Sequence, residues 1–218
     1  MRNISAKYFT IMFIGLSIYL NAQTINRYGT TTANFLEIGV GSRATSMGDA
    51  YVAVANDVSS IYWNPAGLSN VSRSSALFSI QPWLVDIDMM FAGGAFVVPN
   101  VGVLGLGITH LDYGEMDVTN LEYQDGTGEQ FGASDVAATF TFSRKIVSWF
   151  SFGTSMKYIS SKIWHSSASA FAVDLGVLVN TNFFSFTGKD GDGMNIGMSI
   201  SNYGTRMKYD GIDNYQPI

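Results

Sequence analysis

The sequence predicts an all-β fold: a transmembrane antiparallel β-barrel preceded by a short segment that is not built from strands. Only 13% of the 218 residues are charged, whereas soluble domains average roughly 25%. Aromatic residues make up 14% and there are 23 glycines, which suits a wall that meets lipid on one side. Apolar and small polar residues alternate repeatedly after residue 100, as side chains do along a strand.

Residues 1–22 are typical of a secretory signal peptide. Arg2 and Lys7 give it a positive start, residues 8–20 form a short apolar run, and Ala22 offers a small residue at the cleavage point. A spanning helix needs about 20 apolar residues, so this run is too short for an uncleaved anchor, the alternative interpretation. We therefore expect a mature chain that acts outside the cytoplasm.

Residues 23–73 are predicted to form a hatch segment inside the barrel. Residues 35–69 do not alternate, small residues dominate 42–55, and Asn64-Pro65-Ala66-Gly67 is a turn signal. Within this segment, Trp63 either plugs a path through the lumen or anchors the hatch by packing against the inner wall. The second role is favoured, since large aromatic residues mostly act by burying area.

Residues 74–218 are predicted to supply barrel strands, and seven are expected, at 74–82, 90–98, 101–112, 134–145, 151–163, 169–180 and 194–205. In 136–143 the apolar set alternates with a small polar set, Ala137, Thr139, Thr141 and Ser143. Bacterial barrels have even strand numbers, and Pro217 cannot donate to a closing ladder. The C-terminal strands are therefore expected to be missing from this chain; the alternative is a barrel completed between subunits.

One hairpin can be assigned a register. Pairing 151–163 with 169–180 about a loop centred between His165 and Ser166 sets Met156 opposite Leu175 and Tyr158 opposite Val173. The same register sets Lys157 directly opposite Asp174 on the lumen face. Two opposite charges within a membrane wall must pair or face water, so we predict an inward-pointing pair.

The loops suggest an orientation. Residues 113–133 read as a long polar loop, which is expected on the external side because barrels keep their short turns on the periplasmic side. The stretch 181–193 is longer than a periplasmic turn should be. The two loops therefore indicate opposite orientations of the barrel in the membrane.

Several classes of function find no support. His110 and His165 are the only histidines, and neither forms a full catalytic triad with neighbouring residues, so we expect no enzyme activity. There is no cysteine, Asp190-Gly191-Asp192-Gly193 lacks calcium-loop spacing, and the net charge is −5. No metal, cofactor or nucleic acid is predicted. Gly105 and Gly107 lie within a strand and are expected to leave room for the hatch or to permit curvature.

The run 41–68 carries a specific resemblance, above all in 56–68, which includes Asn56, Asp57, Trp63, Asn64, Pro65 and Gly67. It resembles the N-terminal signature of the PorV/PorQ family, within the wider FadL-like group of outer-membrane transporters. Further similarity lies at 132–135, 156–159, 172–176 and 201–205. Asp49 departs from the family pattern, which often has a glycine there. The resemblance implies an outer-membrane location and a FadL-like barrel with a hatch, and the family's longer chains agree with missing strands.

Three functions stay open under this resemblance. The first, slightly favoured as a generic assignment, is passage of hydrophobic small molecules across the outer membrane, which requires an apolar pocket between hatch and wall. The second is an accessory or shuttle subunit of a type IX-like secretion system that binds other subunits or cargo proteins, with a filled lumen and a large loop surface. The third is a structural barrel without transport. Outer-membrane lipid is an expected partner in each.

Overall fold

The computed structural model describes residues 33–85, 87–185, 187 and 193–211. The predicted signal peptide, the first ten residues of the predicted hatch segment and Pro217 lie outside these residues, as does Asp190-Gly191-Asp192. In the described part of the chain, no helix is long and apolar enough to cross a membrane.

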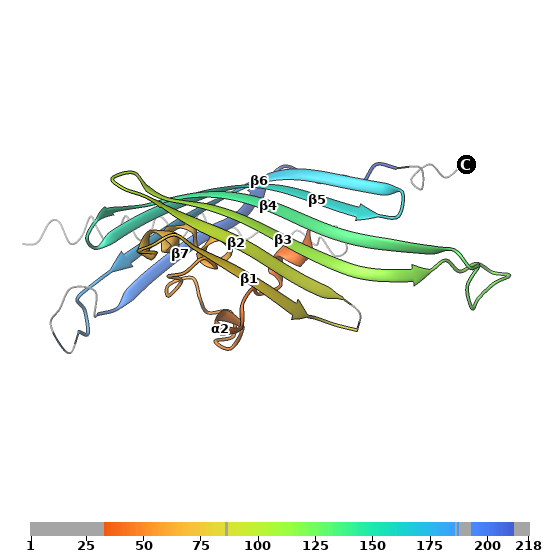
Figure 1. The fold of residues 1–218 in the computed structure, drawn as a ribbon, viewed down its shortest axis with the longest axis horizontal. Coiled ribbons are helices and arrows are strands. Elements are labelled where there is room, and N and C mark those ends of the chain that lie inside the picture. The colour runs from red at the N-terminus through yellow and green to blue at the C-terminus, as the bar shows by residue number, and fades with distance from the viewer. Residues whose placement is uncertain (1–32, 86, 186, 188–192, 212–218) are drawn as a thin grey trace, which may run out of the picture. The chain divides into compact units, whose positions relative to one another are not determined.

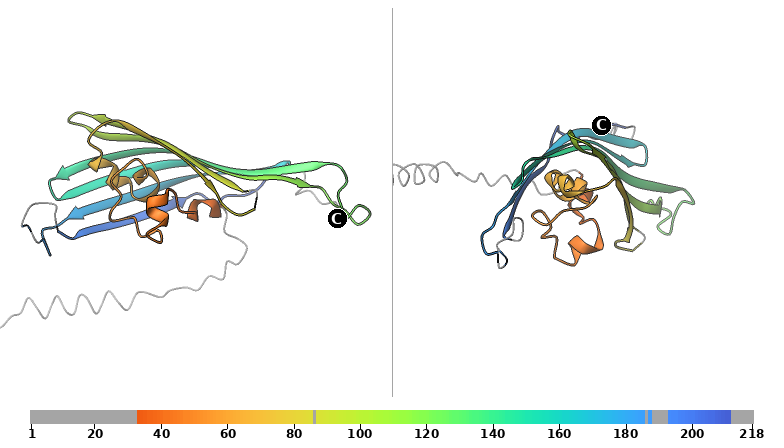
Figure 2. Two further views of the ribbon diagram at one scale, coloured as in Figure 1. Left: turned by 60° about the horizontal axis from the view of Figure 1, so that its bottom comes forward. Right: turned by 60° about the vertical axis from the view of Figure 1, so that its left-hand side comes forward.

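Seven antiparallel strands form one sheet in chain order, which confirms the all-β prediction and every predicted strand. They are β1 (Ser75–Pro82), β2 (Asp88–Val98), β3 (Gly102–Asp117), β4 (Gln130–Val147), β5 (Phe150–Ile163), β6 (Ser166–Asn180) and β7 (Asn195–Gly204). The sheet curves into an arch, with β1 and β7 as its edges (Figures 1 and 2).

Strands β3 and β4 are longer than predicted. They pair as far as Asp117 and Gln130, so the loop predicted at 113–133 shrinks to residues 118–129. A β-bulge between Asp112 and Glu115, with Gly114 at a φ of 72°, absorbs the break in alternation, and pairing then resumes at Glu115 and Gly132. Figure 1 shows this hairpin reaching past its neighbours.

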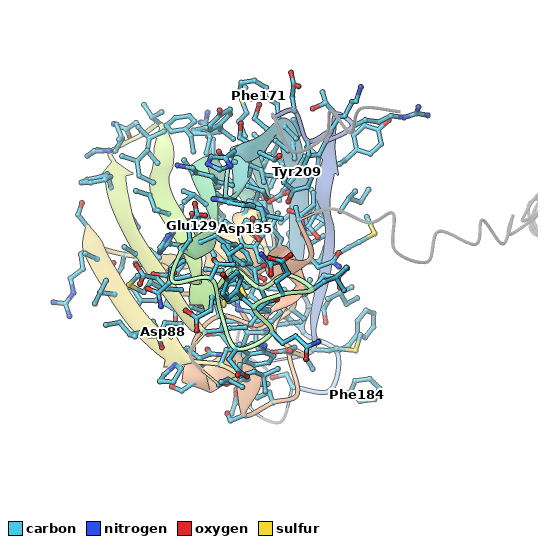
Figure 3. All side chains as sticks on the ribbon, turned by 90° about the vertical axis from the view of Figure 1, so that its right-hand side faces the viewer. Asp88, Glu129, Asp135, Phe171, Phe184 and Tyr209 are labelled. Atoms are coloured by element: carbon cyan, nitrogen blue, oxygen red, sulfur yellow. The ribbon has the colours of Figure 1, made fainter. Side chains whose placement is uncertain are left out.

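The sheet has small polar residues on its covered inner face and large apolar residues on its exposed outer face, which is the reverse of a soluble protein. On β4 the predicted small polar set faces inward and is buried, with Thr141 and Ser143 at 0% exposure, whereas Phe140 on the opposite face is 47% exposed. The same holds on β5, where Met156 is 63% exposed and Ser155 is 1% exposed. Figure 3 shows Asp135 inside the arch and Phe171 outside it.

The hatch segment, residues 34–70 in the structure, lies on the concave face of the arch (Figure 2). It consists of η1 (Asn34–Glu37), α2 (Ser42–Thr45), α3 (Ser60–Trp63) and η2 (Pro65–Asn70). Six of its apolar residues pack into one core with inward side chains of the strands: Phe35, Leu36, Val40, Val58, Ile61 and Leu68 from the segment, and Met89, Phe91, Val103, Leu111 and Ile159 from the wall.

The predicted register of the β5–β6 hairpin is wrong by two residues. Met156 lies opposite Val173, Tyr158 lies opposite Phe171, and Lys157 lies opposite Ala172. The turn is the dipeptide Trp164-His165, and Trp164 adopts a left-handed φ of 49°. The serine-rich run after it, which reads as loop, instead begins β6, so the centre of the hairpin shifts by one position.

Candidate functional site

The side chain of Asn64 joins the hatch segment to the wall. It is fully buried, and its amide nitrogen donates to the Val52 carbonyl at 2.8 Å and to the Val177 carbonyl of β6 at 3.2 Å. Its amide oxygen accepts from the Ala66 N–H, which caps η2 at Pro65. One side chain therefore bonds to three backbone groups, two of the hatch segment and one of the wall.

Glycines of the strands let the wall approach the motif closely, and the surface that they form under residues 64–68 is called the seat. A Cβ at Gly176 would overlap the Asn64 amide oxygen, and one at Gly153 would overlap the backbone of Pro65 and Ala66. Gly105 and Gly107 admit Leu68 and Ile61 in the same way, which confirms the prediction that they leave room for the hatch. The predicted motif residue Gly67 is itself tight, because a Cβ there would overlap the Ala55 carbonyl.

Trp63 packs within the hatch segment. Its ring meets those of Tyr51 and Tyr62 edge to face, with centroids 6.2 and 5.3 Å away, and its indole N–H donates to the Val40 carbonyl at 3.0 Å. The contacts are those of an anchor for the segment's own fold. The contacts described for this ring lie within the hatch segment rather than on the inner wall, where the favoured prediction placed them, and the alternative role in gating stays a prediction.

Asn56 and Asp57 lie at the more exposed end of the segment, away from the seat. The Asn56 side-chain oxygen accepts from Arg43 at 3.1 Å. Asp57 accepts from the backbone N–H of Ser59 at 2.8 Å and from the Tyr51 hydroxyl at 3.3 Å. Both side chains therefore brace the loop between α2 and α3.

Lys157 and Asp174 form the predicted inward-facing pair, although diagonally rather than directly opposite. Their charged atoms are 2.8 Å apart and their side chains are 3% and 1% exposed. The ammonium also donates to the Asn202 side-chain oxygen at 2.7 Å, and Asp174 accepts from the Asn202 backbone N–H at 2.7 Å. Such a fully desolvated pair requires these additional bonds to offset the loss of water.

The cluster links β5, β6, β7 and the hatch segment. Asn202 has a φ of 58° and sits in a β-bulge that interrupts the pairing of β6 with β7 opposite Asp174. The Tyr62 ring of α3 lies 6.0 Å from the Lys157 nitrogen. Sequence reasoning missed Asn202 and Tyr62, since neither a bulge nor a long-range cation–π contact leaves a periodic signal; the Asn202-Tyr203-Gly204 run within 201–205 was the available hint.

Tyr62 also ties the first part of the segment to α3. Its hydroxyl contacts the carbonyls of Leu36 at 2.6 Å and Ile38 at 2.7 Å. Burial, reinforced by nearby carboxylates of which Asp49 contributes most, raises the pKa of this phenol. The group therefore stays protonated and can donate throughout the physiological pH range.

Replacing Tyr62 with Phe is expected to loosen residues 34–38. The change removes the single hydroxyl proton that these two carbonyls share, and leaving a buried acceptor without a donor costs about 1–3 kcal/mol, while the ring keeps its contacts. Amide hydrogen exchange of the reconstituted protein should show faster exchange in residues 34–38 and unchanged exchange in β4. Unaltered protection of residues 34–38 would contradict this role.

Comparison with known proteins assigns the chain to a family. A family described as "Type IX secretion system protein PorV" matches residues 21–218, which includes all of the given sequence after the predicted signal peptide. No curated protein matches the chain. With a match of this extent, the chain belongs to the PorV family of type IX secretion system proteins.

Proposed function

We propose that this protein is an outer-membrane accessory subunit of a type IX secretion system that binds protein partners. The family match favours this role over the passage of hydrophobic small molecules, which the sequence alone had slightly favoured. The observation that carries the proposal is the family match together with an acidic hairpin that projects beyond an apolar, membrane-sized belt.

The outer face of the sheet supports membrane placement. Arg144 and Ser134 lie ten residues apart on this face of β4, and Ser134 is level with Asp112 and Lys162 on the neighbouring strands. Ten residues span about 34 Å, or about 24 Å at the usual tilt near 45°, close to the roughly 25 Å apolar band of outer-membrane barrels. Between these two levels, the outward residues of β1 to β7 include no Asp, Glu, Lys or Arg.

The concave side gives less support to a passage. The contact of η2 with β4, β5 and β6 is close, and the backbone of residues 64–68 is buried there. The apolar groove of about 850 Å³ lies on the outer face, not between the hatch segment and the wall. The close contact of η2 with the wall agrees with the accessory role, in which partners bind surface outside the sheet.

The β3–β4 arm, residues 112–130, offers that surface. It carries six acidic residues, and the sequence has no lysine or arginine between Arg73 and Arg144. Its loop is held in shape by the Asn120 side chain, which accepts from the N–H groups of Glu122 and Tyr123, and by a bond from Gln130 to Asp117. A shaped, single-sign surface favours a partner with a basic patch and speeds association.

Neutralising the tip of the arm tests this role. In the full-length protein, Glu122→Gln/Asp125→Asn/Glu129→Gln is expected to lower the yield of co-purified secretion subunits or cargo at least tenfold, with no loss from the outer membrane. The matched control is Arg144→Gln/Lys145→Gln, which changes charges at the opposite end of the sheet and should leave the yield unchanged. Undiminished partner recovery with the neutralised arm would refute the assignment of the docking surface.

A further inference from the structure

The outer face of the sheet is hollowed where small residues cross neighbouring strands. Ala76, Ala92, Gly94 and Ala138 form the floor, on β1, β2 and β4. Larger side chains rise around them, including Phe78, Leu106, Phe140 and Phe171, each 47–66% exposed. The result is an apolar groove of about 850 Å³ within the belt.

The small floor residues are not explained by the hatch segment. A Cβ on inward-facing Gly93 would lie 2.9 Å from the Val58 side chain, so that glycine is required by the hatch. A Cβ on its neighbour Gly94 would meet only the Phe96 ring, at 3.4 Å, and the backbone of Gly94 is not in the left-handed region. The absence of a side chain at Gly94 therefore keeps open space on the outer face.

A polar pocket of about 520 Å³ continues the same face toward the end of the belt. Acidic residues line one side of it, Asp112 and Glu115 of β3, and Lys162 of β5 lines the other. Asp112 and Lys162 both pair with Ser134 on the strand between them, which sets their backbones about 10 Å apart. In the described part of the chain, Lys162 and Glu115 form no ion pair.

The groove and the pocket together have the extent of one lipid leaflet. Leu106, in the groove, and Asp112, in the pocket, are six residues apart on β3, which is about 20 Å along the strand and about 14 Å along a membrane normal at 45° tilt. That is close to half the hydrocarbon core. Trp164 lines the pocket, where a bilayer interface favours tryptophan.

We propose that this face is a binding site for a diacyl phospholipid with an ethanolamine headgroup. The acyl chains occupy the groove over Gly94, Lys162 binds the phosphate, and the carboxylates of Asp112 and Glu115 receive the ammonium. The opposite charges on the two sides of the pocket match the opposite charges of one zwitterionic headgroup. A purely anionic lipid would leave the two carboxylates unpaired and facing its phosphate. This proposal rests on the membrane placement proposed above.

Native mass spectrometry of the full-length protein in mild detergent tests the site, with phosphatidylethanolamine and phosphatidylglycerol of identical acyl chains as probes. We expect phosphatidylethanolamine to bind at least tenfold more tightly. Lys162→Gln and Asp112→Asn should each weaken it about tenfold, which corresponds to the loss of one charge-assisted hydrogen bond. Gly94→Leu, which fills the groove, should abolish retention of the lipid.

Matched controls separate the site from general surface effects. Arg144→Gln removes a positive charge from the other end of the belt, Glu37→Gln removes an exposed acidic charge from the hatch segment on the concave side, and Ser169→Leu adds a leucine to the outer face beyond the groove. None should change the preference. Equal binding of the two lipids, tighter binding of phosphatidylglycerol, or a Gly94→Leu variant that retains lipid would each overturn the proposal.

A membrane fractionation distinguishes failure of this site from failure of the proposed function. If the protein resists alkaline carbonate extraction but shows no lipid preference, only the lipid site is refuted. If carbonate releases the protein from membranes, the membrane placement fails and the lipid site fails with it.

Discussion

Gly153→Ala is expected to detach η2 from the wall and to destabilise the protein by about 3 kcal/mol, the upper part of the range for overpacking a core. The added methyl group would overlap the backbone of Pro65 and Ala66. A backbone cannot rotate aside as the end of a side chain can, so the hatch segment must move. Urea unfolding in lipid vesicles should show a lower midpoint, and limited proteolysis should cut residues 41–57 sooner than in the unaltered protein.

Gly94→Ala is the matched control. It is also a glycine-to-alanine change within a strand, but its methyl group meets only the Phe96 ring at 3.4 Å on the outer face. Since alanine restricts the unfolded chain, the variant should be neutral or more stable by up to about 1 kcal/mol. Equal destabilisation by both substitutions would mean that strand propensity, and not the seating of the hatch segment, explains the effect of Gly153→Ala.

The strands were predictable because a membrane-facing sheet has two chemically distinct faces. On β4, Phe140 and Thr141 lie on opposite faces and differ in size and polarity, so the alternation is visible in the sequence. Strand ends are not predictable where that contrast between the faces is lost. Beyond Asp112 the bulge at Gly114 breaks the alternation, and the extension of β3 to Asp117 is too short to show a new period. The position of the turn at Trp164-His165 was predicted wrongly for a similar reason, because a strand that begins with serines looks like a loop in the sequence.

Single residues of the site were predictable from the sequence, but most of the contacts between them were not. Asn64 and Pro65 stand out in a turn signal, but nothing in the sequence shows that the Asn64 amide reaches Val177, 113 residues away. The partnership of Lys157 with Asp174 was predictable because both are charges on an inward face. The third member, Asn202, was not, because its contact depends on a bulge that shifts the register of β7.

Lys157→Met is expected to be strongly destabilising, by about 3–5 kcal/mol, because it leaves the Asp174 carboxylate buried without its counter-ion. Asp174 is 1% exposed, and its remaining bond is to the Asn202 backbone. The cost should appear in urea unfolding of the reconstituted protein, with faster hydrogen exchange at the β6–β7 bulge. An effect under 1 kcal/mol would show that water reaches the carboxylate.

The double variant Lys157→Met/Asp174→Asn separates the pair from the bonds around it. Asparagine keeps an oxygen that can accept from the Asn202 N–H, while both charges are gone, and uncharged replacements of buried pairs are often tolerated. We therefore expect the double variant to be more stable than Lys157→Met alone, with a coupling of at least about 2 kcal/mol. Because the cluster includes β7 and contacts Tyr62 of the hatch segment, simple additivity would mean that these elements are held by apolar packing alone. Coupling of the expected size would instead mean that the ion pair of Lys157 and Asp174 fixes the position of the edge strand β7 relative to the hatch segment.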